Sequence, residues 1–488
     1  MTETITAVLS RLAAIMERAG VAAFVAGGYI RDRLAGRETA DVDIAVQANS
    51  LDVARVVAEA LGGTLVLLDE ANLVARVIAP GPERPWQLDF TCVSGAIEGD
   101  LGRRDFTVDA MALPLDALVR DEWTALVDPF GGRADLAARV LRATDDAVFR
   151  NDPIRLLRGI RLCAEMGLEP EERTRSLIER DAALLGTAAG ERVREELLRL
   201  LATPQAGRWL HKMAGNGLLF SIVPEMALCR GVDQPGAHYW DVLDHSLETV
   251  TAVEHLLGER DWPHANADLR RDVPWSEAAA AHFSGEVSHG SSHRTLLKLA
   301  GLLHDVAKPQ TKSIDETGRV RFLGHPAEGA AIAAAIMERL RFSARESAVV
   351  TTMVMDHLRP AQMSGDGLPT RRAVFRLFRD TGEAGLDVLF LSLADLLATL
   401  GPDPDLAEWR QKAELVSFVL AEHSRQEERT VPAKLIDGTD IMSVFGLPPG
   451  KPVGRLLTAV NEAQATGEVT TREEALDFVC RSLKKGDQ

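Results

Sequence analysis

The stretch GGYIRDRLAGRETADVDIAV, residues 27–46, combines a glycine pair, a nearby arginine and two aspartates placed two residues apart. Its alternating end, DVDIAV, predicts a β-strand with Val42 and Ile44 facing a core. Side chains at i and i+2 of a strand point the same way, so Asp41 and Asp43 should project together, about 6.5 Å apart along the chain. Two carboxylates held like this can bind a hard divalent cation such as Mg²⁺.

The residues before these aspartates favour phosphate binding. Gly27 and Gly28 end an apolar segment and open a helical pattern, so backbone N–H groups could approach a phosphate there. Arg31 adds a fork-shaped donor for the same anion. A tight turn and a solvated strand face would use the same residues, and only their combination favours phosphate chemistry.

Further charged residues follow at similar strand and turn positions. Asp89, in QLDFT, is the expected third carboxylate, and an exposed strand acid is the alternative. Arg103 and Arg104 begin RRDFTVDAM, residues 103–111. They could hold a triphosphate or a nucleic-acid backbone, and a charged loop is the alternative.

The bulk composition limits the class of protein. A chain of 488 residues with 46% hydrophobic and 26% charged residues is expected to form several soluble domains. Four distant cysteines without a C-x-x-C pair argue against a disulfide framework and a thiolate zinc site. A formal charge of −17 means that nucleic acid would have to bind through local basic strips and divalent ions. No leader or membrane-spanning pattern is visible, so we expect a cytoplasmic protein.

The hydrophobic periodicity changes along the chain. Strand-like segments separated by Gly, Pro and Asn predict an α+β unit that ends near residue 145, and helical runs follow from about Asp152. Residues 258–293, rich in charge, Pro, Gly and Ser, are expected to form a loop or insertion. The last segment is expected to form short helices separated by Gly-Pro breaks.

A string of motifs resembles a known family. GGYIRD and DVD, followed by RRDFTVDAMAL, DPFGGRADL and NDPIRLLRGIRL, are similar to the bacterial class II tRNA nucleotidyltransferases. These are the CCA-adding enzymes and their poly(A) polymerase relatives, in the polymerase-beta-like superfamily. The resemblance implies an α+β head with a mixed sheet, then a helical neck for nucleotide recognition and RNA binding, an HD-type helical domain and a helical tail. The corresponding boundaries are 1–145, 146–225, 226–400 and 401–488.

The resemblance also assigns roles in the head. Mg²⁺ would bind Asp41 and Asp43, and Asp89, expected from its strand position, would be the further catalytic acid. The nucleotide's phosphates would lie near Gly27, Gly28, Arg31 and Asp32. The ribose would lie near Arg104, Asp105 and Asp109. The family often has Asn at the last of these positions, so the charge of Asp109 is a departure.

Base choice is expected to come from the helix NDPIRLLRGIR. Asp152, Arg155 and Arg158 are spaced i, i+3 and i+6 and share one face. A carboxylate accepts from an exocyclic amine and a guanidinium donates to ring acceptors, so protein groups can read a base edge. In the family the corresponding acid and arginine do this, which implies Asp152 and Arg155. The usual Glu before that acid is Asn151 here, and a salt-bridged surface helix is the alternative.

A basic strip is expected to hold the acceptor stem through shape and phosphate contacts. Arg161 could serve this strip as well as the nucleotide site. The other members would be Arg103, Arg139, Arg142 and Arg150. A solvated charged face is the alternative.

A second constellation begins with His304 and Asp305 in LLHDVAK. It resembles the HD-type metal phosphohydrolase pattern, which implies as further ligands His245, His325, His357 and Asp395. Imidazoles and carboxylates suit transition metals as well as Mg²⁺. A metal there could generate hydroxide for phosphoester hydrolysis of terminal or 2′,3′-cyclic phosphates on RNA. Core histidines in an inactive scaffold are the alternative.

The resemblance and the residues together predict template-independent transfer of CMP and AMP from CTP and ATP to the 3′ end of tRNA. The transfer would be a two-Mg²⁺ in-line displacement that releases pyrophosphate. Alternatives are poly(A) synthesis, addition of only CC or only A, an HD phosphohydrolase with a nucleotide-sensing head, and an RNA chaperone. The expected partners are tRNA, CTP and ATP, with neither DNA nor a membrane.

Overall fold

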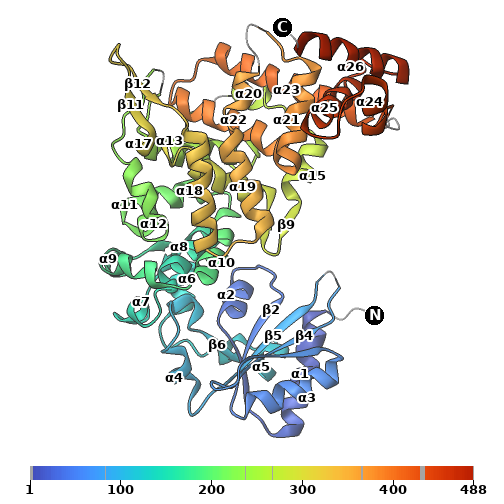
Figure 1. The fold of residues 1–488 in the computed structure, drawn as a ribbon. Helices are drawn as coiled ribbons and strands as arrows, with labels where there is room; N and C mark the ends of the chain where they lie inside the picture. Colours follow the sequence, from blue (N-terminus) through green and yellow to red (C-terminus); the bar gives the residue numbers. More distant parts are fainter. Residues whose placement is uncertain are drawn as a thin grey trace. The chain divides into compact units, whose positions relative to one another are not determined.

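The protein forms two compact units in a computed structural model that describes residues 4–82, 84–236, 238–265, 267–363, 367–428 and 435–486. The first unit is Met1–Ala188 with Asn216–Ile222, and the second is Ala189–Gly215 with Val223–Gln488. A mixed sheet with helices comes first in the chain and helices dominate the remainder, which confirms the predicted fold class (Figure 1). The four-part division of the chain stays a prediction.

The head is built on one six-stranded sheet within the described residues. Its strands are β1 (Ala23–Ala26), β2 (Asp41–Val46), β3 (Thr64–Asp69), β4 (Val74–Ala79), β5 (Trp86–Cys92) and β6 (Ala112–Pro114). Their order is β3-β4-β5-β2-β1-β6. β2 and β5 are parallel, and the other neighbouring strands are antiparallel.

The alternation in DVDIAV places its valines and its isoleucine on one face of the sheet. Val42 and Ile44 are buried together with the apolar stripes of α1 (Ile5–Ala19) and α3 (Ser50–Leu61). Ala45 belongs to a smaller cluster that includes α4 (Ile97–Leu101). Because Asp41 and Asp43 alternate with Val42 and Ile44, they project on the same face as Ala45.

Other helices of the first unit surround this sheet or come after it in the chain. They are α2 (Gly28–Leu34), α5 (Leu115–Val119), α6 (Gly132–Ala137), α7 (Val148–Asn151), α8 (Ile154–Met166), α9 (Glu172–Asp181) and α12 (Leu218–Ile222). Short 3₁₀ helices are η1 (Thr107–Asp109), η2 (Trp123–Ala125) and η3 (Ala182–Thr187), and β7 (Val140–Leu141) pairs with β8 (Glu169–Pro170).

The second unit is helical. Its first part contains α10 (Gly190–Leu201), α11 (Ala206–Gly215), η4 (Pro224–Cys229), α13 (Val242–Leu256), α14 (Ala267–Arg271), α15 (Glu277–Ser284), α16 (His293–Leu303) and α17 (Lys308–Thr311). It continues with α18 (His325–Arg339), α19 (Ala344–Asp356), α20 (Arg359–Gln362), α21 (Arg371–Thr381), η5 (Gly382–Ala384), α22 (Gly385–Leu400) and α23 (Leu406–Glu428). Helices α13, α16, α19 and α22 pack on one another.

One expectation about this half was wrong in part. Residues 258–293 contain helices α14 and α15 and the hairpin of β9 (Glu286–Ser288) and β10 (Ser291–Ser292), so the stretch is not simply a loop. A second hairpin joins β11 (Lys312–Ile314) to β12 (Val320–Phe322). Strands of two or three residues are too short for a period-two pattern to show in the sequence.

The C-terminal segment has a core of its own. Helices α24 (Gly438–Phe445), α25 (Lys451–Ala465) and α26 (Arg472–Gly486) bury Ile441, Val460 and Val479 together. Within the described residues, no helix combines the length and the apolar character that crossing a membrane requires. The four cysteines are free thiols, as their spacing predicts.

Candidate active site and metal cluster

Strand register aligns the carboxylates of the head. In the parallel pair β2–β5, Asp43 lies opposite Asp89 and Asp41 lies opposite Gln87, so the three predicted acids share one face. Arg76, on β4, binds both oxygens of Asp89, with Nε–Oδ1 and Nη2–Oδ2 distances of 2.7 Å. Asp89 is therefore neutralised by an arginine, whereas Asp41 is exposed.

A second arginine approaches Asp43. Arg104 Nη1 lies 3.5 Å from Asp43 Oδ2 and 3.4 Å from the Asp109 carbonyl oxygen. Burial and the carboxylates of Asp89 and Asp109 raise the pKa of the Asp43 carboxyl, although Arg104 acts in the opposite direction. Asp43 therefore faces two further carboxylates as well as one arginine, and a divalent cation would be stabilised among these acids.

Gly27 makes this close approach possible. Its φ of +69° lies in the region that favours glycine, and a Cβ built there would lie 2.7 Å from Asp43 Oδ2 and closer still to Arg104 Nη1. The backbone N–H of Gly27 donates to the Met111 carbonyl oxygen at 3.0 Å. The glycine turn at the start of α2 therefore packs directly against the carboxylate and arginine pair.

Arg31 is buried and bound to acids. Its Nη1 lies 2.6 Å from Asp109 Oδ1, and its Nε donates to Asp32 Oδ1 at 3.0 Å. Despite burial, Asp109 and Asp32 raise the pKa of the Arg31 guanidinium above its usual range. The charge of Asp109, a departure from the family pattern, thus has a partner here. Binding of phosphate by Arg31 stays a prediction, as it does for Gly28.

The helix expected to select the base lies against the RRD motif. Arg155 Nη2 donates to the Arg103 carbonyl oxygen at 3.0 Å, and Arg158 Nη1 lies 3.2 Å from Asp105 Oδ2. Arg155 Nε is 3.9 Å from Asp152 Oδ2. Two motifs that are about fifty residues apart in the sequence are thereby brought together beside Asp43.

The arginines of the expected basic strip have acidic neighbours. Arg161 is buried, with Nη1 2.5 Å from Glu165 Oε2. Arg142 binds both oxygens of Asp135, at 3.0 and 3.1 Å. Arg150 and Arg103 are paired as well, with Asp181 at 3.3 Å and Asp100 at 2.8 Å, and Arg139 is exposed with a φ of +57°. Their role in RNA binding stays a prediction.

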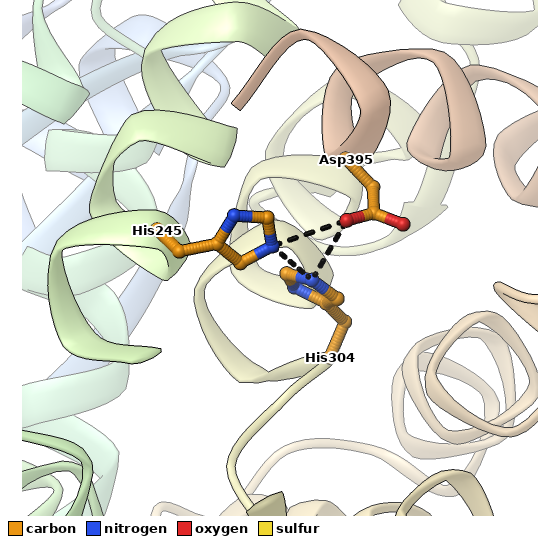
Figure 2. Close-up of side chains that lie close together, drawn as sticks. All are labelled: His245, His304 and Asp395. Carbon is orange, nitrogen blue, oxygen red and sulfur yellow. Dashed lines mark hydrogen bonds and ion pairs between the residues drawn. The ribbon is translucent and has the colours of Figure 1, made fainter. Parts of the chain in front are cut away.

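The helical unit brings together all six residues of the HD-type pattern. Figure 2 shows His245 from α13, His304 just after α16 and Asp395 from α22 pointing at one another. His245 Nε2 lies 3.2 Å from His304 Nε2 and 3.1 Å from Asp395 Oδ1. These three side chains form one group that could hold a metal ion.

Asp305 links this group to a second one. Its Oδ2 lies 3.2 Å from His304 Nε2, and its Oδ1 lies 3.4 Å from His325 Nε2 and 3.9 Å from His357 Nε2. Asp305, His325 and His357 are buried and form a further group with ligand spacing. One carboxylate therefore faces both groups, an arrangement that suits two ions with a shared ligand.

The orientations of the histidine rings fit metal binding. The Nδ1 atoms of His304, His325 and His357 lie 2.8–2.9 Å from backbone carbonyl oxygens. A neutral imidazole that donates through Nδ1 presents the lone pair of Nε2 to the cluster.

Charge in the cluster is concentrated on a few groups. Although burial opposes it, Asp305 and Asp395 raise the pKa of His304 to about 10. Burial and the nearby His304 lower the pKa of His357 to about 4. Against the effect of burial, the charges of His304 and Lys308 hold the pKa of Asp305 well below its usual range. A bound cation would take over the stabilising role of the His304 proton.

Two contributors were missed from sequence. Lys308 Nζ lies 2.5 Å from Asp305 Oδ2, and Arg76 holds Asp89. The sequence offered a signal for each of them. Arg76 is a cation within the otherwise apolar stretch LVARVIA, and Lys308 follows Asp305 by three residues, about one helical turn.

Comparison with known proteins reveals the same order of parts. A family model described as "Poly A polymerase head domain" matches residues 23–142, and "Probable RNA and SrmB- binding site of polymerase A" matches residues 167–229. The model described as "HD domain" matches residues 242–400.

Relatives match along almost the whole chain. The A-adding tRNA nucleotidyltransferase of Deinococcus radiodurans is 34% identical over 465 residues, which cover 94% of this chain and 95% of that protein. The CC-adding tRNA nucleotidyltransferase of Thermus thermophilus is 35% identical over 470 residues, which cover 94% and 93%. The solved structure of the Thermotoga maritima CCA-adding enzyme complexed with tRNA has the same fold, with a TM-score of 0.60, 21% identity and coverage of 98% and 95%.

The head and the helical cluster define a class of protein, namely nucleotidyltransferases with a poly(A)-polymerase-type head followed by an HD-type domain. Within this class, the chain belongs to the tRNA nucleotidyltransferase family. It is therefore an enzyme.

Proposed function

We propose that this enzyme transfers CMP and AMP from CTP and ATP to the 3′ end of tRNA, building the CCA terminus and releasing pyrophosphate. The observation that carries the proposal is the alignment of Asp43 with Asp89 on neighbouring parallel strands, with Asp41 on the same face and Arg104 beside Asp43. Support for the substrates comes from the names of the relatives and from related CCA-adding enzymes solved with ATP and with CTP.

Asp41 and Asp43 would hold Mg²⁺, because both carboxylates face the same way and Asp89 lies opposite Asp43 on the neighbouring parallel strand. When bound, two Mg²⁺ ions would supply the charge that activates the RNA 3′-hydroxyl and stabilises the leaving pyrophosphate in an in-line displacement. The protein itself contributes by positioning the substrate. Arg104 would orient the triphosphate against Asp43, and the absence of a side chain at Gly27 would let the triphosphate approach closely.

Base selection would use Asp152 and Arg155. The carboxylate would accept from the exocyclic amine that cytosine and adenine share, and the guanidinium would donate to a ring acceptor. Arg158 and Asp105 would fix the helix α8 against the RRD motif, since their side chains are 3.2 Å apart. A template is then unnecessary because protein groups provide the complementary edge.

A narrower reaction is a second candidate, addition of only CC or only A. It is favoured by one observation: the two relatives described above, which match along more than nine tenths of the chain, are named A-adding and CC-adding. The CCA-adding enzyme of Geobacillus stearothermophilus, by contrast, aligns with only half of this chain, 259 residues or 50%.

Metal-dependent hydrolysis of terminal or 2′,3′-cyclic phosphates is a candidate second activity. It is favoured by the six converging side chains around Asp305. Either a transition metal or Mg²⁺ could be held there. If hydrolysis were the main activity, the head would serve only to sense nucleotides.

Nucleotide addition separates these possibilities. Purified enzyme is incubated with tRNA lacking its last three nucleotides, or lacking only the last one, with labelled CTP, ATP or both. Two C additions followed by one A support the proposal. Arrest after CC, or A addition only to tRNA ending in CC, supports the narrower reaction, and a long A ladder would indicate poly(A) synthesis.

Variants assign the two sites. Asp41→Asn with Asp43→Asn should abolish addition and leave hydrolysis of 2′,3′-cyclic AMP intact, whereas Asp52→Asn, an exposed acid on α3, is the matched control. His304→Ala with Asp305→Ala should do the reverse. Loss of addition only in the latter variant would contradict the proposal, and RNA binding without any reaction would favour the chaperone alternative.

A further inference from the structure

A separate group of side chains lies outside the HD-type cluster. His282 from the last turn of α15, His293 at the start of α16 and Asp387 in the first turn of α22 meet around one carboxylate. His282 Nε2 lies 2.8 Å from Asp387 Oδ2, and His293 Nδ1 lies 3.0 Å from the same oxygen. The group joins three helices and the β9–β10 hairpin between His282 and His293.

Hydrogen bonds explain this group only in part. Both imidazoles approach Oδ2, whereas the buried Oδ1 of Asp387 has no hydrogen-bond partner among the described residues. Asp387 is fully buried, and an unsatisfied buried carboxylate oxygen is costly. The neighbouring acid Glu383 supplies no donor to Oδ1, because a carboxylate is itself an acceptor and both of its oxygens are bound by Arg345.

The donor set fits a transition metal. Two imidazole nitrogens and a carboxylate oxygen with a solvent molecule form a common tetrahedral site for Zn²⁺, in which ligand atoms are about 3.3 Å apart. The distances from the two imidazole nitrogens to Asp387 Oδ2, 2.8 and 3.0 Å, need only a small expansion. Nitrogen ligands disfavour Mg²⁺ and Ca²⁺, which prefer oxygen. The His282 side chain is 21% exposed, so solvent can supply the fourth ligand.

This group is distinct from the HD-type cluster. On α22, Asp387 and Asp395 are eight residues apart, which is about 12 Å along a helix. Along α16, His293 precedes His304 by eleven residues, or about 16 Å. The same two helices therefore carry one group of ligands near their starts and another further along.

We propose that His282, His293 and Asp387 bind one transition-metal ion, of which Zn²⁺ is the best fit, and that this ion fastens α15 and the β9–β10 hairpin to α16 and α22. The ion balances the charge of Asp387 and coordinates its carboxylate. It holds in place the two helices that position His304 and Asp395.

The test is the metal content of the full-length enzyme. After loading with Zn²⁺ and removal of unbound ion by gel filtration, His282→Gln and His293→Gln should each contain one equivalent of zinc less per chain than wild type. His289→Gln is the matched control, because His289 is exposed in the turn of the same hairpin. His304→Ala with Asp305→Ala should lose zinc from the HD-type cluster and lose one further equivalent when His282→Gln is added.

A second variant gives a positive signal. His282→Cys replaces an imidazole with a thiolate, so the Co²⁺-loaded variant should gain a near-ultraviolet thiolate-to-Co²⁺ charge-transfer band that Co²⁺-loaded wild type lacks. The proposal is overturned if His282→Gln is folded by circular dichroism yet retains the zinc content of wild type. It is equally overturned if His282→Cys gains no such band, since the group would then be held by hydrogen bonds alone.

Discussion

Replacing Gly27 by alanine tests whether the head depends on the close approach of Asp43 and Arg104. Gly27 has a φ of +69° and a ψ of −135°, a conformation that costs a residue with a side chain about 1–3 kcal/mol. The new Cβ would also displace Arg104 Nη1 and Asp43 Oδ2. Misplacing catalytic groups by about 1 Å can lower a rate by about 100-fold, so kcat/KM for nucleotide addition should fall at least that much.

Two other glycines separate strain from contact. Gly36→Ala carries a similar strain, with a φ of +70°, but its Cβ would meet no atom within 4 Å, so it should lose about 1–2 kcal/mol of stability and keep its activity. Gly28→Ala would place a Cβ 3.5 Å from Arg31 Nη2, an ordinary contact, and should be nearly neutral. Single-turnover incorporation of labelled CTP and urea unfolding measure the two effects. If Gly27→Ala adds nucleotides within about fivefold of wild type, the assigned geometry is not what catalysis requires.

Three further outcomes are expected. Burial raises the pKa of Glu254 from 4.5 to about 7. Between pH 4.5 and about pH 7 the folded protein therefore binds one proton more than the unfolded chain. Its free energy of unfolding should fall by up to about 3 kcal/mol as the pH rises through this range. Glu254→Gln should flatten this slope in urea titrations, and an unchanged slope would refute the assignment. Arg76→Met frees both oxygens of Asp89 and should lower the Mg²⁺ concentration for half-maximal addition, whereas an identical Mg²⁺ profile would place Asp89 outside the metal site. Asp109→Asn should cost about 2 kcal/mol in thermal or urea unfolding because buried Arg31 loses a charged partner, and equal stability would show the pair to be dispensable.

The sheet of the head could be predicted because its signals are local. Alternation in DVDIAV and in the segments around Asp89, together with glycine turns, defines the strands β1–β5 within a few residues. The alternation also gives the face on which Asp41 and Asp43 lie. The register that sets Asp43 opposite Asp89 joins strands separated by two others in the sequence, and local patterns carry no information about which distant strand is the neighbour.

The ion pairs between residues far apart in the sequence were beyond the reach of sequence reasoning. Arg31 is expected to hold a phosphate, and no sequence pattern indicated that its guanidinium is also bound by Asp109, which is 78 residues away. Such a pairing depends on how η1 packs near α2, and no spacing rule encodes it.

The HD-type cluster was predicted through resemblance rather than through periodicity. His245, His304 and Asp395 come from separate helices, and only a family pattern could associate them. The group of His282, His293 and Asp387 had no such pattern. Its two histidines lie in a stretch whose composition indicated a loop, and Asp387 lies about a hundred residues further on.

The number of residues in the helix α16 cannot change without moving the side chains that it positions. Each residue of a helix turns the chain by about 100°, so one insertion between His293 and His304 would swing one of them to a different side of the bundle. Insertions and deletions in this helix should therefore abolish function, whereas the nearby hairpin turn at His289 and Gly290 should tolerate them. A library of single-codon insertions, scored for nucleotide addition, would show this difference.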